Sequence, residues 1–534
     1  MEKKRSISRY IILIAIVALG FLLRIFKLGE VPVSLSWDEA AIGYNAYSIV
    51  QTGKDEYGTA WPLLFKSFND YKLPGYVYST ALSIKLLGLS DFAVRLPSAL
   101  FGTLTILAFY FLLRSLMLKE WQVLFGSLLF AISPWHLQFS RAAFEANGSL
   151  FFVVAGFASL FAARKHPKLY IFSGICLVLS VYFYYTARIL VPLLLIVYAQ
   201  FYRKELSKAK KWVLSGVVIG MLLLIPILPK LIGESNTRIG QVSIFTDEAT
   251  TNDYVLALAR NPNTLWAKLF YNRRIGYVYR FVENYVKNNS LEFLFVRGDP
   301  YPRHHVSGMG YLYAWELPFL LIGIVSLFLK RTEEGLFILA WWLLGAIPAS
   351  FTTGSPHGLR TLATLPAFII LTAKGTFVVL EWLKKQYKTL FVVCLSIITA
   401  GFFVAYLIYY YDYTPRHTPN FWGDGHKYLF ARVEKLKLQY HQIVVTGANF
   451  KPYIYALYYT QYDPASYQKS GTEHGFDAYA FTSASWEDVA VTLERNPKGK
   501  TLFVRTPAEA DSSKPVMEEI KDSFGTVVFV LQEG

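Results

Sequence analysis

Eleven long apolar runs are the feature that most limits how this chain can fold. A helix needs about 20 mostly apolar residues to cross a bilayer, and these runs approach or reach that length. Hydrophobic residues make up 54% of the 534 residues, charged residues only 17%, and the mean hydropathy is +0.33. A soluble protein carries about 25% charged residues. The sequence therefore predicts an α-helical polytopic membrane protein.

The first apolar run follows a basic N-terminus and is too long for a signal peptide, so we predict that it stays as an anchor. The two cysteines, Cys176 and Cys394, lie far apart inside apolar runs, which argues against a disulfide framework or a cysteine metal site. The predicted spans are 10–28, 95–116, 121–134, 149–163, 169–184, 188–202, 212–229, 314–329, 335–351, 361–381 and 389–411.

The segment 74–89 decides the orientation of the chain. It is short, contains Lys85 and is interrupted by Pro74 and Gly75. If it does not cross, every short basic loop lies on the side of the N-terminus, as the positive-inside rule requires. We therefore predict an amphipathic helix in the outer interface, with its ring-rich face in lipid. Most of the net charge of +16 then belongs to cytoplasmic loops, and no nucleic-acid partner is needed to explain it.

This topology places three sizeable segments outside the membrane. Two are the loops 29–94 and 230–313 of a transmembrane domain that spans 1–411. The third is the tail 412–534, in which IVVTGANF, TLFVRT and TVVFVLQ read as strands and 427–440 as an amphipathic helix. We predict a small extracytoplasmic α/β domain there.

The first outer loop carries a pair of carboxylates close to the membrane. Asp38 and Glu39 follow the first span by about ten residues, in SLSWDEAAIGY. Ser36 and Asp38 also suit a helix cap, but a carboxylate at this depth can accept a proton from a hydroxyl nucleophile. Lys72, in FNDYKLPGY, lies just before the predicted interfacial helix, where its side chain can reach to lipid phosphate. Candidate substrate-binding residues of this loop are Tyr44 and Tyr71.

Three short outer loops each keep one arginine, where the positive-inside rule should remove it. These are Arg141, Arg188 and Arg360. Arginine's planar fork suits phosphate, so the three are predicted to form an anion-binding ring facing Asp38 and Glu145. Arg141 is therefore also a substrate-binding candidate. Its alternative role is a surface ion pair with Glu145, four residues on.

The long outer loop holds a basic-aromatic helix, YNRRIGYVYRFVENYV, which anionic headgroups can hold at the interface. The stretch FLFVRGDPYPRHHVSGMGYLY follows it and supplies Arg303 and His304 as substrate-binding candidates. Neighbouring histidines seldom point at one ion, so His305 with Asp38 and Glu145 is kept as a candidate metal-binding set. A divalent metal ion is thus a candidate cofactor, and no cofactor is certain.

Several motifs together resemble glycosyltransferase family 39. They are the Asp-Glu pair, the Lys-x-Pro before the interfacial helix, FAVRLPSALFGTLT, SRAAFEANGS and GSPHGLRTLATLP. The family belongs to the GT-C group, with protein O-mannosyltransferases and the aminoarabinose transferases of lipid A. The resemblance covers residues 8–415. The GD-x-x-x-RH stretch and the tail with YDPASYQ resemble uncharacterised bacterial members.

The resemblance implies a polyprenyl-phosphate sugar donor and an inverting transfer at the outer membrane face. It implies that Asp38 is the catalytic base, with Glu145 at a second acidic position. Lys72 matches the lysine that meets the donor phosphate, and Arg360 with His357 matches a region near that phosphate. The β-trefoil of the eukaryotic mannosyltransferases has no counterpart here, which argues against a protein acceptor. The predicted acceptor is a lipid, a glycan or a protein.

The predicted function is sugar transfer from this donor to a hydroxyl or phosphate acceptor at the outer face of the bacterial cytoplasmic membrane. Membrane lipids would surround the protein. The N-terminus would be cytoplasmic and the C-terminal domain extracytoplasmic. One alternative is a lipid-linked glycan flippase, which requires polar or broken helices at mid-membrane. Others are a non-catalytic scaffold and a transferase or ligase that moves a whole glycan.

Overall fold

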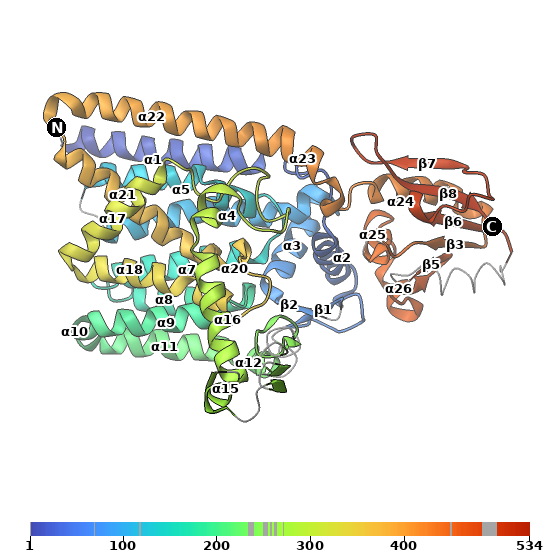
Figure 1. Cartoon of the computed structure of the whole chain (residues 1–534), viewed down its shortest axis with the longest axis horizontal. Coiled ribbons are helices and arrows are strands. Elements are labelled where there is room, and N and C mark those ends of the chain that lie inside the picture. The colour runs from blue at the N-terminus through green and yellow to red at the C-terminus, as the bar shows by residue number, and fades with distance from the viewer. Residues whose placement is uncertain are drawn as a thin grey trace. The chain divides into compact units, whose positions relative to one another are not determined.

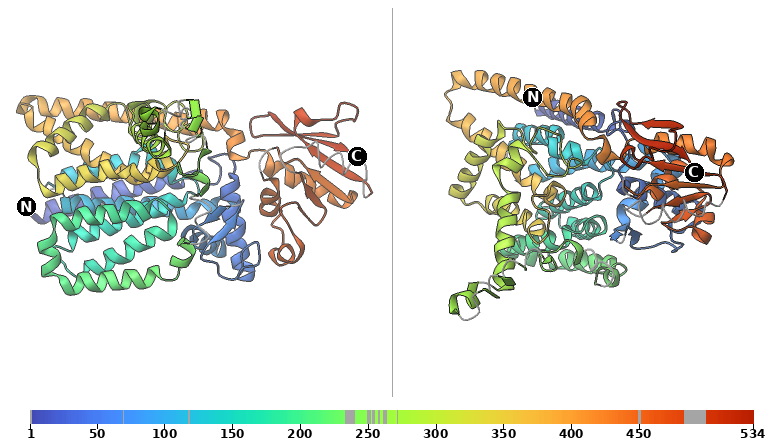
Figure 2. Two further views of the ribbon diagram at one scale, coloured as in Figure 1. Left: turned by 60° about the horizontal axis from the view of Figure 1, so that its bottom comes forward. Right: turned by 45° about the vertical axis from the view of Figure 1, so that its right-hand side comes forward.

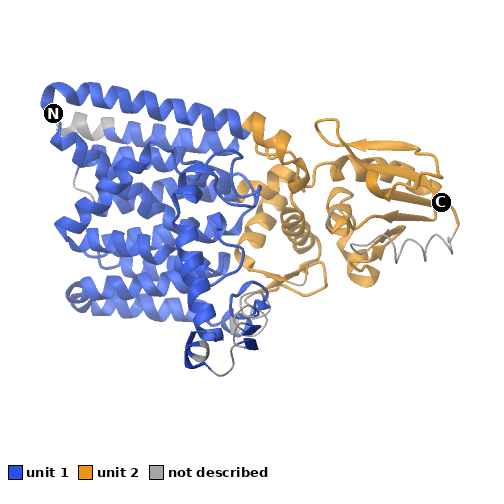
Figure 3. Cartoon of the chain, in the orientation of Figure 1, with its two compact units in different colours: residues 1–26, 98–410 blue, residues 27–97, 411–534 orange. Residues whose placement is uncertain are grey.

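The computed structural model describes residues 2–68, 70–116, 119–232, 240–248, 252, 255–256, 259–260, 264–270, 272–448, 451–482 and 499–534 (Figure 1). It is mostly helical and has a β-sheet region near its C-terminus. The chain divides into two compact units (Figure 3): unit 1 comprises 1–26 and 98–410, and unit 2 comprises 27–97 and 411–534. The segment predicted to form the first outer loop thus groups with the C-terminal region and not with the helices of unit 1.

All eleven apolar runs are helical, and the long helices of unit 1 lie side by side in every view (Figures 1 and 2). α4 begins in unit 2 and continues into unit 1. The helices are α1 (Glu2–Ile25), α4 (Asp91–Leu116), α5 (Glu120–Ile132), α7 (Glu145–Ala162), α8 (Leu169–Phe183), α9 (Ala187–Phe201), α11 (Lys210–Leu224), α17 (Glu316–Lys330), α18 (Glu333–Gly345), α21 (Leu365–Trp382) and α22 (Lys385–Ile408).

Four helical stretches in the described part of the chain are long and apolar enough to cross a membrane. They are Asp91–Leu116, Glu145–Ala162, Gly358–Trp382 and Lys385–His417. Shorter apolar helices are Glu120–Ile132, Leu169–Phe183 and Ala187–Phe201. The chain is therefore a membrane protein, whereas the count of eleven spans remains a prediction.

Small residues let neighbouring helices of unit 1 approach closely. A Cβ on Gly174 of α8 would lie 2.5 Å from the carbonyl oxygen of Gly216 on α11. A Cβ on Gly323 of α17 or on Gly375 of α21 would overlap the backbone of the other helix. Because lipid gives no hydrophobic drive for helix association, close backbone packing of this kind holds membrane helices together.

The basic-aromatic stretch of the long outer loop is helical, as predicted. It forms α16 (Arg273–Asn288), which runs across the long helices (Figures 1 and 2). Asn284 and Asn288 face inward, and Asn284 Nδ2 donates to the carbonyl oxygens of Ser350 and Thr352. Its placement at the membrane interface remains a prediction. Other short elements of unit 1 are α6 (Pro134–Phe139), α10 (Arg203–Lys208), α12 (Leu228–Ile232), α15 (Leu265–Phe270), η1 (Glu292–Val296), α19 (Ile347–Ser350), α20 (Gly358–Thr361) and η2 (Leu362–Thr364).

The first outer segment, in unit 2, forms two helices joined by a hairpin. α2 (Trp37–Thr52) is followed by β1 (Phe65–Ser67), β2 (Asp70–Lys72) and α3 (Pro74–Leu87). β1 and β2 pair antiparallel, with Phe65 opposite Lys72. α2 packs against α3 and against α25 (Pro452–Tyr459). Gly43 makes the second contact close, because a Cβ there would lie 2.6 Å from Cε2 of Tyr458.

The helix predicted at 74–89 exists as α3, but the prediction that its ring-rich face lies in lipid was wrong. Tyr76 is fully buried, and its hydroxyl donates to the carbonyl oxygen of Val94. Tyr78 is half-buried and donates to the carbonyl oxygen of Pro62. The exposed face carries the aliphatic Leu82 and Leu86 instead. The rings turn inward because their hydroxyls find backbone acceptors there, which lipid does not offer.

The C-terminal region of unit 2 contains a six-stranded mixed sheet in the order β4-β5-β3-β6-β8-β7. β3 lies parallel to β5 and β6, and β6, β8 and β7 pair antiparallel. The predicted strands in TLFVRT and TVVFVLQ are confirmed, and that in IVVTGANF begins one residue earlier, with 449–450 outside the described residues. The predicted helix 427–440 is α24 (His426–Leu436) with η5 (Lys437–Gln439). The other elements are β3 (Gln442–Val445), α26 (Pro464–Ser470), β4 (Gly475–Phe476), β5 (Tyr479–Phe481), β6 (Thr501–Arg505), β7 (Glu518–Lys521) and β8 (Val527–Glu533).

Candidate active site

Asp38 and Lys72 meet in unit 2. The Nζ of Lys72 lies 2.6 Å from Oδ1 of Asp38. The Asp38 side chain is 42% exposed, whereas that of Lys72 is only 8% exposed, so the lysine does not extend freely toward lipid. The first turn of α2 holds the carboxylate and the end of β2 holds the ammonium. The Asp38 carboxylate thus has an ammonium group beside it, and a carboxylate can act as a proton acceptor.

Glu39 is turned into the protein, which corrects its prediction as a catalytic residue. It completes a capping box with Ser36, whose backbone N–H donates to Glu39 Oε2 at 3.0 Å. Its carboxylate also pairs with Arg95, whose Nε lies 2.9 Å from Oε1. The side chain of Glu39 is 3% exposed and that of Arg95 is 0% exposed. The expected cap at the start of α2 therefore exists, with Glu39 rather than Asp38 completing it.

Tyr44 is also enclosed, which corrects its prediction as a substrate-binding residue. It is fully buried, and its hydroxyl donates to the carbonyl oxygen of Tyr462. Its ring meets that of Tyr467 edge-on. Burial raises the pKa of the Tyr44 hydroxyl, so it remains a neutral donor. Tyr71 is half-buried on β2, opposite Lys66, and its role in binding remains a prediction.

Glu56 is a buried acid whose protonation affects the stability of unit 2. It is 1% exposed and accepts a hydrogen bond from Asn45 Nδ2 at 3.2 Å. Burial raises the pKa of Glu56 from 4.5 to about 8. The folded state therefore binds this proton more tightly than the unfolded state. The contribution of Glu56 to stability is largest at low pH and is lost as the pH rises from 4.5 through about 8.

Glu56→Gln is expected to weaken this pH dependence, because a neutral amide has no proton to lose. The measurement is the thermal midpoint of the purified protein at about pH 5 and about pH 9, for the wild type and the variant. The wild type should lose more stability between these two values. Equal shifts in both proteins would contradict the assignment.

Arg141 is buried in unit 1, so its alternative role in a surface ion pair is wrong, whereas its role in substrate binding remains a prediction. Its Nη1 donates to the carbonyl oxygen of Leu23 at 2.6 Å and its Nη2 to that of Phe26 at 2.7 Å. Its Nε donates to the Tyr410 hydroxyl at 2.9 Å. These bonds tie the end of α1 to the rest of the unit, so Arg141 has a structural role. Glu145, half-buried, starts α7, where the helix dipole favours a carboxylate.

The other two arginines of the predicted ring line one pocket of unit 1. It has a volume of about 390 Å³ and includes Arg188 at the start of α9 and Arg360 on α20. Arg188 lies over the ring of Tyr185, 4.3 Å from its centroid. Arg360 Nη1 donates to Thr352 Oγ1 at 2.6 Å and to the carbonyl oxygen of Thr353 at 2.7 Å. Two guanidinium groups in one pocket suit a phosphate.

Arg188 also lines a second pocket, of about 550 Å³, which is almost wholly apolar. Helices α8, α9 and α11 form its walls, with side chains such as Leu177, Val191 and Val217. A single arginine therefore joins a cationic pocket to an apolar groove between helices. A ligand with a phosphate on a long hydrocarbon chain matches this combination.

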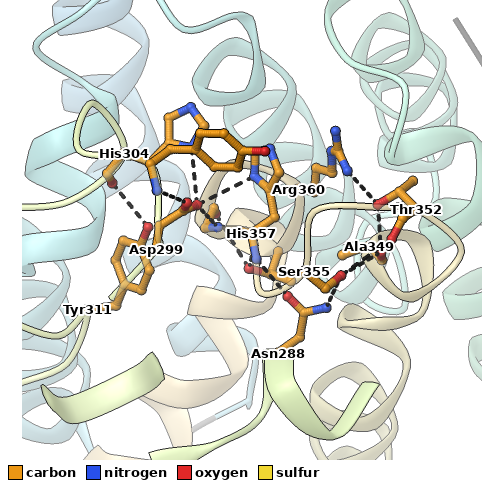
Figure 4. Close-up of polar contacts among 12 residues, drawn as sticks. Asn288, Asp299, His304, Tyr311, Ala349, Thr352, Ser355, His357 and Arg360 are labelled. Carbon is orange, nitrogen blue, oxygen red and sulfur yellow. Dashed lines mark hydrogen bonds and ion pairs between the residues drawn. The ribbon is translucent and has the colours of Figure 1, made fainter. Parts of the chain in front are cut away.

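A buried group of metal-ligand side chains lies near α20, and the sequence did not reveal it (Figure 4). Asp299 Oδ2 lies 3.1 Å from Nδ1 of His304 and 3.6 Å from Nδ1 of His357. It also accepts the backbone N–H of Gly358 at 2.6 Å. Asp299 belongs to the GD-x-x-x-RH stretch of the sequence. Only the tertiary structure places it beside His357, 58 residues later in the chain.

His305 is not a member of this group, and the predicted set of Asp38, Glu145 and His305 is not among the metal-ligand groups of the described residues. Burial lowers the pKa of His305, so its ring is neutral near neutral pH. Neighbouring Arg303 is half-buried, and its carbonyl oxygen accepts from Gln138 Nε2 at 2.7 Å. Its predicted role in substrate binding remains a prediction, as does that of His304.

One family model and several solved structures are similar to this chain. A family model described as dolichyl-phosphate-mannose-protein mannosyltransferase matches residues 72–229. The structure of ArnT from Cupriavidus metallidurans in the apo state matches with a TM-score of 0.58 and 14% identity, over 99% of this chain and 98% of that one. ArnT bound to undecaprenyl phosphate matches with a TM-score of 0.53 and 14% identity, over 97% of both chains.

The archaeal oligosaccharyltransferase AglB from Archaeoglobus fulgidus, in complex with an inhibitory peptide and a dolichol-phosphate, matches with a TM-score of 0.54 and 14% identity. The match covers 93% of this chain and 69% of AglB. No curated protein sequence matches the chain. At this identity the structures establish the fold, and the family match covers the Lys-x-Pro, RLPSAL and SRAAFEANGS motifs.

The chain therefore has the fold of the GT-C glycosyltransferases and resembles family 39, with the family model matching residues 72–229. The predicted resemblance is thereby confirmed.

Proposed function

We propose that this glycosyltransferase moves a sugar from a polyprenyl-phosphate donor to a hydroxyl or phosphate acceptor, with inversion at the sugar carbon. The observation that carries the proposal is the pocket with Arg188 and Arg360 beside an apolar groove. It fits a phosphate head joined to a long hydrocarbon tail. The undecaprenyl phosphate bound by ArnT and the dolichol-phosphate bound by AglB have this chemistry and support the same donor class.

Asp38 has the properties of the general base. Its exposed carboxylate accepts the proton of an acceptor hydroxyl as that oxygen forms a bond to the anomeric carbon. The bond from that carbon to the phosphate oxygen breaks, and the electron pair leaves with the polyprenyl phosphate. One displacement of this kind inverts the anomeric centre. Cations stabilise the charge developing on the leaving phosphate. The pocket of unit 1 offers Arg188 and Arg360 for this role, and the family resemblance assigns the same role to Lys72.

The charge distribution supports a position in the bacterial cytoplasmic membrane with the N-terminus inside and transfer at the outer face. We propose eleven spans and an extracytoplasmic C-terminal domain on this basis. The acceptor class remains lipid, glycan or protein. In sealed right-side-out vesicles that hold lipid donor, an acceptor added outside should be glycosylated. Use only of an acceptor sealed inside would overturn this orientation.

The decisive experiment supplies purified protein with lipid-linked sugars extracted from the native host and follows the released polyprenyl phosphate. The mass of the product separates transfer of one sugar from transfer of a whole glycan. Release that depends on an acceptor supports the proposal. Movement of intact donor between leaflets without release would favour a flippase instead.

Replacing the donor-facing cations is expected to weaken donor use. Arg188→Ala and Arg360→Ala should each raise the KM for the lipid donor about tenfold to hundredfold, because each removes charge-assisted hydrogen bonds worth about 1.5–3 kcal/mol. Lys72→Ala should likewise affect donor use more than acceptor use. The measurement is a donor titration at saturating acceptor.

The matched control for this titration is Arg297→Ala. Arg297 lies in the segment 230–313, outside the pocket; its side chain is 79% exposed and pairs with Glu292. Its KM for the donor should stay at the wild-type value. If both Arg188→Ala and Arg360→Ala kept the wild-type KM for the donor, this pocket would not be the donor-phosphate site.

A further inference from the structure

We propose that Asp299, His304 and His357 bind one divalent transition-metal ion, with Zn²⁺ as the best match. The site lies in unit 1 and goes beyond the proposed sugar transfer, whose steps do not use it. Two histidines and one carboxylate are a ligand set that Zn²⁺ favours.

The spacing of the three ligand atoms fits one ion. Zinc binds imidazole nitrogen at about 2.0–2.1 Å and carboxylate oxygen at about 2.0–2.2 Å, so two ligands of a tetrahedral site lie about 3.4 Å apart. Asp299 Oδ2 lies 3.1 Å from His304 Nδ1 and 3.6 Å from His357 Nδ1. All three atoms lie within 4.8 Å of one another. A small movement of one ring brings them to the tetrahedral spacing.

The three side chains are also shielded from water. They are 0% exposed for Asp299, 9% for His304 and 8% for His357. The two imidazole rings lie against each other with centroids 4.8 Å apart. Burying a carboxylate and two imidazoles together is costly unless their lone pairs are satisfied, and a cation shared by all three satisfies them.

The surroundings hold the ligands in place, as the outer shell of a metal site does. Asp299 Oδ1 accepts the backbone N–H of Tyr301 at 2.8 Å, and Oδ2 accepts that of Gly358 at 2.6 Å. Asn288 Oδ1 accepts the backbone N–H of His357 at 2.9 Å (Figure 4). Both oxygens of the carboxylate are thus oriented, and Oδ2 keeps a lone pair for the metal.

A cluster joined by hydrogen bonds alone explains the geometry less well. His304 Nδ1 can donate to Asp299 Oδ2 at 3.1 Å, but the 3.6 Å separation from His357 Nδ1 exceeds hydrogen-bond distance. Both Nδ1 atoms nevertheless lie beside the same oxygen. A cation between the three atoms would be bound by Asp299 Oδ2 and by one lone pair of each ring nitrogen.

The ion would join the loop that carries Asp299 and His304 to the start of α20. Arg360 lies two residues after Gly358 on α20 and reaches the cationic pocket. Bound metal would therefore fix the backbone that presents Arg360. This consequence rests on the proposed donor site, whereas metal binding itself does not.

The test measures metal content and not turnover. Full-length protein purified without chelators is expected to hold about one zinc ion per chain by elemental analysis. His304→Gln and His357→Gln should each reduce bound zinc to background after dialysis, as should Asp299→Asn. The matched control is His305→Gln, the neighbouring histidine outside the cluster, which should keep the ion. Size-exclusion profiles show which variants are folded.

A second readout covers variants that fold poorly. The chelated wild-type protein given Co²⁺ should show the strong visible absorption of a tetrahedral site with nitrogen and oxygen ligands, and folded His304→Gln should not. Three results would each overturn the proposal. They are wild-type protein that retains no zinc when the metal is added back, zinc retained in full by both histidine variants, and loss of zinc in His305→Gln alone. None of them bears on sugar transfer, which the release assay measures separately.

Discussion

Asp38→Asn is expected to lower sugar transfer at least about a hundredfold while leaving a folded, membrane-inserted protein. A positioned general base contributes about 10²–10⁴-fold to the rate, and an amide cannot take the proton of the acceptor. The side chain is 42% exposed, so the change buries no new polar group. The measurement is the rate of polyprenyl phosphate release at saturating donor and acceptor.

The control is Asp412→Asn. The Asp412 carboxylate is 62% exposed and forms an ion pair with Arg416, four residues on. This variant carries the same chemical change and should transfer sugar at the wild-type rate. Near-normal transfer by Asp38→Asn would show that Asp38 is not the general base. Its ion pair with Lys72 would then have another role.

Arg95→Met is expected to destabilise the protein strongly. Its guanidinium binds Glu39 and donates to the carbonyl oxygens of Leu28, Pro32 and Ser34. Removing one partner of a buried ion pair costs about 3–5 kcal/mol, because the other charge stays buried without compensation. The same change should loosen the start of α2, where Asp38 lies. The measurement is the free energy of unfolding, or the thermal midpoint in detergent.

Two further variants sharpen this result. Arg432→Met removes an ion pair with Glu518 whose side chains are 40% and 36% exposed, so it should cost less than about 1 kcal/mol. The double variant Arg95→Met with Glu39→Gln should regain part of the lost stability, because no carboxylate is then left unpaired. If Arg95→Met were as stable as Arg432→Met, the buried pair would not hold unit 2 together.

The sequence alone determined the helical layout and the resemblance to glycosyltransferase family 39. Apolar runs become helices because lipid forces each backbone to satisfy its own hydrogen bonds, and all eleven runs are helical. The strands of residues 412–534 could likewise be predicted, from alternating hydrophobicity and from β-branched residues. Arg188 and Arg360 could be selected because the positive-inside rule should remove arginine from short outer loops. Asp38 and Lys72 could be selected from the motifs that resemble family 39.

Only the tertiary structure decided which polar residues are enclosed. Glu39 pairs with Arg95 over 56 residues, and Arg141 bonds to Leu23 over 118 residues. Tyr44 is covered by the C-terminal region, 418 residues away. The Asp299 cluster depends on a histidine from another loop. Hydrophobicity and turn chemistry are properties of neighbours in the chain, whereas the free energy of burying a charge depends on partners that only folding brings close.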